Sequence, residues 1–152
     1  FSFPKVKGDF TVFNSKYDNE TSALQVYRDN AVLEAISYPG AQYNFIGDWD
    51  LDTSGEKYNL VIMAVDSNLE NPGGLYVHVE GTPTASDVKI MELGDSVPDR
   101  SGETFTYIAS PTIGTWNGVT QVSFVGYSNT GYRAIWVWSK SATSAAKLQA
   151  VV

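Results

Sequence analysis

Apolar, β-branched and aromatic residues recur in short runs about every ten residues, separated by clusters of Gly, Pro, Asn, Asp and Ser. This spacing is typical of an all-β domain, because each run has the length of a strand and each cluster favours a turn. The pattern predicts strands at Phe10–Phe13, Tyr43–Gly47, Tyr58–Asp66, Leu75–Glu80, Val88–Leu93, Thr104–Ala109, Thr120–Tyr127 and Tyr132–Trp138.

The segment Ser22–Ser37 fits either a helix or a hairpin. Its first four residues resemble a capping box, and much of its composition favours helix. The alternative is a hairpin of Leu24–Arg28 and Ala31–Ser37 that turns at Asp29 and Asn30. We favour the hairpin, because the apolar residues would lie on several faces of a helix and would not form one stripe.

Two of the predicted strands indicate how the sheets pack. Leu60–Val65 is apolar at every position, which predicts a central strand buried on both faces. Leu75–Glu80 alternates, which predicts one buried face and one exposed face. Together they predict a single domain over residues 1–152, an antiparallel β-sandwich of two sheets with a jelly-roll or Ig-like arrangement. A partly closed β-barrel is the alternative fold.

Charge and composition exclude several classes of partner. The net charge is -7, and the ten Lys and Arg residues are scattered, so no basic patch is available for nucleic acid. The chain has no Cys, which excludes disulfide scaffolds and thiolate metal sites. The longest apolar run, Leu60–Val65, is far too short for a bilayer, so we expect no membrane insertion.

The beginning of the chain and its polar residues predict a location. The sequence starts at Phe1 without an initiator Met, and Phe is too large for ordinary Met removal. A processed, exported protein is therefore expected. The abundance of Ser, Thr, Asn, Gly and Tyr agrees with a secreted, extracellular setting.

An acidic cluster is the candidate metal site. In an extended backbone Asp48, Asp50 and Asp52 point the same way, and Glu56 follows closely. Oxygen-rich sets of this kind bind Ca²⁺, so these four residues are the predicted ligands of a structural calcium. Thr53 stands where an EF-hand loop needs Gly, so the cluster is not an EF-hand. The alternative, which we favour, is an acidic turn solvated by water.

The chain offers few residues for catalysis. Its single histidine, His78, falls on the less apolar face of the alternating strand, so we expect it at the surface. No Gly-x-Ser-x-Gly motif and no glycine-rich nucleotide-binding motif occurs. We therefore predict a protein that is not an enzyme and requires no cofactor. A small glycan-active hydrolase that uses paired carboxylates is an alternative.

Aromatic residues near the C-terminus are the candidate ligand-binding site. Alternation places Tyr132, Trp136 and Trp138 on one face of their strand, and Ile135 and Val137 on the other. If the aliphatic pair points inward, the three rings form an exposed strip with a spacing of about 7 Å, comparable to a sugar ring. The alternative, the commoner arrangement in sandwiches, is that both indoles fill the core.

Trp116 and Trp49 are further candidates, and Trp116 is expected to be exposed because it lies in a loop, the turn Gly114–Gly118. These features predict a non-catalytic, lectin-like recognition or adhesion module that binds carbohydrate, such as a cell-surface glycan. The alternative is a self-assembling structural subunit of an extracellular filament, coat or capsid. Its terminal strands, Phe1–Phe3 and Leu148–Val152, would then pair with copies of itself.

Overall fold

The computed structural model describes residues 4–16, 22–37, 45–54, 56–65 and 72–151. Apart from one turn of 3-10 helix, η1 (Thr84–Ser86), the regular structure of these residues is β-strand, which confirms the all-β fold class. No helix in this part of the chain is long and apolar enough to cross a membrane. The strands are β1 (Lys5–Lys7), β2 (Phe10–Lys16), β3 (Ser22–Arg28), β4 (Ala31–Ile36), β5 (Phe45–Ser54), β6 (Lys57–Val65), β7 (Pro72–Val79), β8 (Val88–Glu92), β9 (Phe105–Trp116), β10 (Val119–Ser128), β11 (Arg133–Ser141) and β12 (Lys147–Val151).

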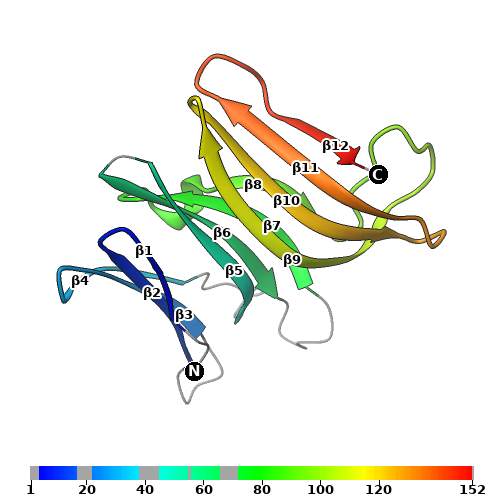
Figure 1. Ribbon diagram of the computed structural model, residues 1–152. Coiled ribbons are helices and arrows are strands. Elements are labelled where there is room, and N and C mark those ends of the chain that lie inside the picture. The colour runs from blue at the N-terminus through cyan, green and yellow to red at the C-terminus, as the bar shows by residue number, and fades with distance from the viewer. Residues whose placement is uncertain (1–3, 17–21, 38–44, 55, 66–71, 152) are drawn as a thin grey trace.

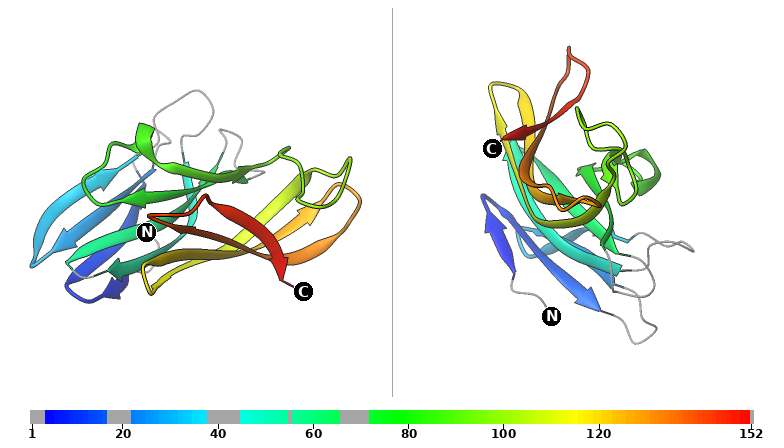
Figure 2. Two further views of the ribbon diagram at one scale, coloured as in Figure 1. Left: turned by 90° about the horizontal axis from the view of Figure 1, so that it is seen from above. Right: turned by 90° about the vertical axis from the view of Figure 1, so that its right-hand side faces the viewer.

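The strands form three antiparallel sheets of four, each following the order of the chain. We call them the first sheet (β1 to β4), the central sheet (β5 to β8) and the third sheet (β9 to β12) (Figure 1). Two further views place the first and third sheets on opposite sides of the central sheet (Figure 2). The predicted sandwich is confirmed, with three layers where two were expected. Over the described residues no sheet closes into a barrel.

The central strand β6 contributes side chains to two separate hydrophobic cores. Leu60 and Ile62 pack between the first and central sheets, whereas Val61 and Met63 pack between the central and third sheets. Successive side chains of a strand point to opposite faces, so an uninterrupted apolar run fills both sides of a covered sheet. The prediction that Leu60–Val65 is buried on both faces is confirmed.

One face of strand β7 was expected to be exposed, with His78 at the surface, and for His78 this prediction is wrong. Leu75 and Val77 lie in the core toward the third sheet, as their alternation indicated. His78 points to the other face, yet none of its surface is exposed. The first sheet covers that face, and nothing in the pattern of one strand reveals a third layer.

The segment at residues 22–37 is the predicted hairpin, formed by β3 and β4. Asp29 and Asn30 have φ of 53° and 63°, so both turn residues are left-handed. This is the two-residue turn that matches the twist of paired strands, and Asp and Asn tolerate it. Strand β1 was not predicted, because it is short and its single apolar residue, Val6, lies between two lysines. Strand β12 overlaps the terminal strand expected at Leu148–Val152, and it pairs with β11 of the same chain.

Packing in the third sheet depends on a glycine near the C-terminal end of β10. A Cβ atom on Gly126 would lie 2.8 Å from Cδ1 of Trp136 and 3.0 Å from Cε1 of Phe105. The Trp136 indole, 1% exposed, thus packs directly over the glycine backbone and meets Phe105 edge to face. Any side chain at residue 126 would displace these rings.

We predict that Gly126→Ala lowers the free energy of unfolding by about 1–3 kcal/mol, because a methyl group is forced into a filled core. Urea denaturation measures the change. Gly114→Ala in β9 is the matched control, since a Cβ there meets no atom within 4 Å. The control should stay within about 0.5 kcal/mol of the wild type. Equal losses in the two variants would contradict the packing argument.

Candidate functional site

The predicted aromatic strip does not form. Trp136 and Trp138 share a face, as alternation indicated, but that face is the core, and the indoles are only 1% and 4% exposed. Ile135, on the opposite face, is 53% exposed. The assignment of Ile135 and Val137 to the core is therefore wrong. Burying two indoles removes more apolar surface from water than burying two aliphatic side chains does.

Tyr132, the third member of the strip, is half-buried and one of its ring faces is occupied. The Arg100 guanidinium lies 3.8 Å from the ring centroid, and Trp136 meets the ring edge to face. Arg100 is held in turn by Glu103 at 2.8 Å. Hydrogen bonds from Arg100 and Ser128 lower the pKa of Glu103 to about 2, so the carboxylate keeps its charge.

Trp116 is exposed, as predicted, with 75% of its surface in solvent. It is the last residue of β9, and Asn117 and Gly118 form the turn with φ of 49° and 74°. This tight turn brings β10 back beside β9 and leaves the indole at the end of the hairpin. Trp49, the other candidate, is 2% exposed and belongs to the core between the first and central sheets.

A groove of about 330 Å³ runs beside Trp116 on the third sheet. Its lining comes from β9, β10 and β11: Thr112, Ile113, Gly114, Thr115, Trp116, Gln121, Ser123 and Val137. Gly114 has nothing within 4 Å of the position that a Cβ would take, so the floor is open at that point. The groove thus has an aromatic wall at one end and a glycine in its floor.

The polar groups of the groove are hydroxyls and one amide. Thr112 and Ser123 face each other across β9 and β10, with their side-chain oxygens 2.7 Å apart. Gln121 lies opposite Gly114 in the same register. None of the lining side chains is charged. These residues were not predicted, although they alternate with the buried positions of their strands and so share the face of Trp116.

Asp48, Asp50 and Asp52 lie in strand β5, so the prediction that these aspartates form a solvated turn is wrong, whereas Glu56 lies in the turn after β5. Nζ of Lys5 is 3.2 Å from Oδ1 of Asp50, and Nζ of Lys7 is 2.6 Å from Oδ1 of Asp52. The backbone N–H of Ile113 donates to the second oxygen of Asp50 at 3.0 Å. Two lysines from β1 therefore supply counter-charge to carboxylates that we expected water or a cation to neutralise.

The other two predicted calcium ligands, Asp48 and Glu56, are exposed. Asp48 accepts a hydrogen bond from the backbone N–H of Trp49 at 2.9 Å. Within the described ranges no group of three or more histidine or acidic side chains is placed to hold a metal ion. Calcium binding at Asp48, Asp50, Asp52 and Glu56 stays a prediction, and the ion would share two of these carboxylates with lysines.

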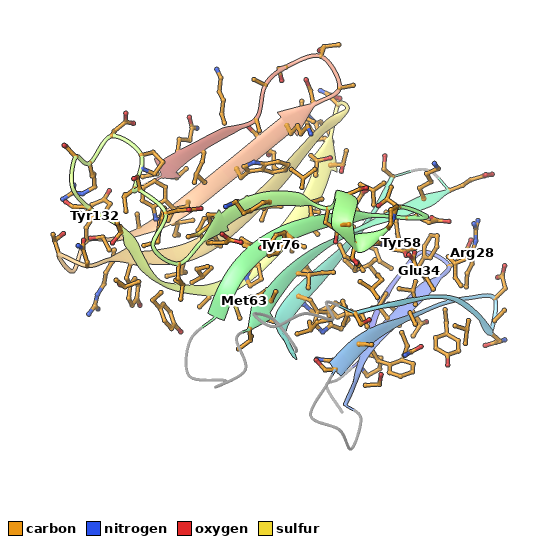
Figure 3. The ribbon with its side chains drawn as sticks, turned by 180° about the vertical axis from the view of Figure 1, so that it is seen from behind. Arg28, Glu34, Tyr58, Met63, Tyr76 and Tyr132 are labelled. Atoms are coloured by element: carbon orange, nitrogen blue, oxygen red, sulfur yellow. The ribbon has the colours of Figure 1, made fainter. Side chains whose placement is uncertain are left out.

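A buried charged cluster, which the sequence did not indicate, joins the first and central sheets around His78. Nδ1 of His78 is 2.7 Å from Oδ1 of Asp87, and Nε2 is 3.4 Å from Oε1 of Glu34. The Tyr58 hydroxyl donates to the second oxygen of Glu34. Figure 3 shows Glu34 and Tyr58 beside each other where the two sheets meet.

The carboxylates set the protonation of His78. Burial alone would lower its pKa, but the hydrogen bond and charge of Asp87, reinforced by Glu34, raise the pKa above the ordinary value. Burial and the bond to Glu34 also raise the pKa of Tyr58, which keeps its proton. His78 has no exposed surface, so its ring contacts only the protein and links the two sheets, whereas the Glu34 side chain is 24% exposed.

No protein-family model matches this chain, and neither curated proteins nor solved structures give a significant match.

We predict that stability falls as the pH rises above the ordinary histidine value of 6.5. A pKa that is raised in the folded state means that protonation favours folding. The contribution is complete below pH 6.5 and is lost as the pH passes through the folded-state pKa. Urea unfolding at a series of pH values measures this slope, and His78→Gln should abolish it.

Because the chain has one histidine, its C2 proton gives an unambiguous NMR titration. Glu34→Gln keeps a hydrogen-bond acceptor for Tyr58 but removes one negative charge, so it should lower the pKa of His78. A wild-type pKa at or below 6.5 would show that desolvation outweighs the two carboxylates.

We predict that Lys7→Met destabilises the fold by about 1–3 kcal/mol, because the Asp52 carboxylate, 6% exposed, loses its counter-charge. Lys5→Met should cost less, since Asp50 is more exposed and keeps its bond from the Ile113 backbone. Urea denaturation in EDTA and in Ca²⁺ measures both effects. If calcium binds the cluster, a hundredfold excess over Kd would add about 2.7 kcal/mol to wild-type stability, and equal stabilities would exclude it.

Proposed function

We propose that this protein is a non-catalytic recognition module that binds carbohydrate in the groove beside Trp116. The observation that carries the proposal is an exposed indole at the end of a groove lined by neutral hydroxyl and amide groups. A secreted location and a role in adhesion to cell-surface glycans belong to the same proposal. It assigns no catalytic residue.

The chemistry of the groove suits a sugar. C–H groups on one face of a pyranose ring pack against an aromatic face, and the ring hydroxyls need donors and acceptors at the edge. Trp116 offers the aromatic face, and Gln121 with the pair Thr112 and Ser123 offers the polar groups. Because the lining carries no charge, it favours a neutral hydroxylated ligand over an ionic one.

The size and rigidity of the groove support the same proposal. Its volume of about 330 Å³ lies at the small end of ligand sites, so it suits one or two sugar units. The polar lining belongs to paired strands and not to long loops. Such a site is formed before the ligand arrives, which reduces the ordering cost of binding.

We predict that Trp116→Ala weakens glycan binding by about 1–3 kcal/mol, on the scale of flat rings that stack on aromatic side chains. A glycan array identifies the ligand, and calorimetry gives its Kd. Because the indole is 75% exposed, stability should change by no more than about 0.5 kcal/mol. Gly114→Val, which fills the floor of the groove, should weaken binding as well.

The matched control is Tyr107→Ala on the same face of the third sheet, outside the groove. Tyr107 is 42% exposed and stacks on Tyr127, so its loss removes an aromatic ring without touching the groove. Equal losses of affinity in the Trp116 and Tyr107 variants would place the site elsewhere. Absence of any bound glycan would exclude the proposal.

Self-assembly is a second candidate, favoured by the outward face and edge of the third sheet. Ile135 and Val151, paired across β11 and β12, are 53% and 45% exposed. Within the described residues β12 has a partner strand on one side only, so its other edge is open to a copy of the chain. Light scattering of Ile135→Lys against wild type tests this. Residues 1–3, the other predicted arm, lie outside the described residues.

A further inference from the structure

The core between the central and third sheets is open at one end. A cavity of about 220 Å³ lies there, and its apolar walls include Val77 and Val79 from β7, Val88 from β8 and Trp138 from β11. The cavity lies apart from the Trp116 groove, since none of its lining residues is shared with it. The two hollows lie against different parts of the β9–β10 hairpin and its neighbouring strands.

At this end of the core, side chains that point inward are still partly exposed to solvent. Val79 continues the inward row of Leu75 and Val77, yet it is 36% exposed. On β11 the inward row of Trp136 and Trp138 continues to Lys140, which lines the same cavity. Apolar surface left in water at the end of a core is a site where an apolar ligand gains free energy by burial.

Lys140 gives the cavity a charged end. It forms no ion pair with any described residue, and no carboxylate belongs to the lining. The whole chain carries a net charge of -7, so its general field repels anions. Attraction of an anion to this end must therefore come from the local lysine.

We propose that this cavity binds a small apolar carboxylate, such as a short-chain fatty acid. The hydrocarbon part lies among Val77, Val79, Val88 and Trp138, and the carboxylate pairs with Lys140 at the mouth. Thr120, on the inward row of β10, offers a hydroxyl beside the lysine. The proposal is independent of carbohydrate binding at Trp116.

Titration with hexanoate, followed by ¹H–¹⁵N NMR, tests the proposal. The indole N–H signal of Trp138, assigned with Trp138→Phe, should shift and saturate. Affinity should rise from butyrate to hexanoate by roughly fourfold per methylene, since each added group leaves water. Hexanol and hexylamine should bind more weakly than hexanoate, because neither can pair with a lysine as an anion does.

Lys140→Met should weaken hexanoate binding by about two- to fivefold, which is the scale of one solvent-exposed ion pair. The matched control is Lys147→Met on β12, which removes the same charge from a position outside the cavity lining. Val79→Asp places a carboxylate against the bound one and should also weaken binding. Residues 79 and 140 are exposed at the mouth, and near-identical spectra of the free variants would show that the fold is kept.

Two results would overturn the proposal. One is a Trp138 signal that does not move, or shifts spread over the surface that do not saturate. The other is equal affinity of the Lys140 and Lys147 variants for hexanoate, which would show that binding depends on the overall charge of the protein and not on Lys140. Neither result bears on glycan binding, which Trp116→Ala tests separately.

Discussion

The central sheet is covered on both faces, and this constraint governs the rest of the molecule. Strand β6 is apolar throughout Leu60–Val65, as a strand buried on both faces must be. Its residues Leu60 and Ile62 lie in one core, and Val61 and Met63 lie in the other. Neither outer sheet has a second layer of its own among the described residues. Each outer sheet therefore buries its apolar face only against the central sheet, and the three layers depend on one another.

Because the inner faces of the sheets are buried in this three-layer arrangement, a ligand can bind only on an outward face or at the open end of a core. Large aromatic side chains of the third sheet, such as Trp136, serve the core because that is where their area is best removed from water. Trp116 stays exposed because it lies beside the β9–β10 turn, on the outward face of its strand. Lys140 continues an inward row past the end of the core, so its ammonium reaches solvent while its neighbours stay apolar.

Charged groups lie along the contacts of the first and central sheets. His78 is held between Asp87 and Glu34, and Lys7 pairs with Asp52 at the edge of β5. Such ion pairs contribute little net stability, because the cost of removing each charge from water offsets much of their attraction. Breaking one is costly, because its partner stays buried. Any other alignment of the two sheets would leave a buried carboxylate without its partner, so these pairs disfavour alternative alignments.

The sequence by itself determined the local features. Runs and turn residues predicted the all-β class, alternation placed Trp136 and Trp138 on a shared face, and Asp29 with Asn30 predicted a tight hairpin. Only the tertiary structure decided which face of each strand is covered, how many layers exist and that lysines of β1 reach the acidic strand β5. The reason is physical: strand periodicity specifies that two faces differ, whereas the covering sheet comes from residues far along the chain. His78 is buried for that reason, and the pattern of its own strand holds no sign of it.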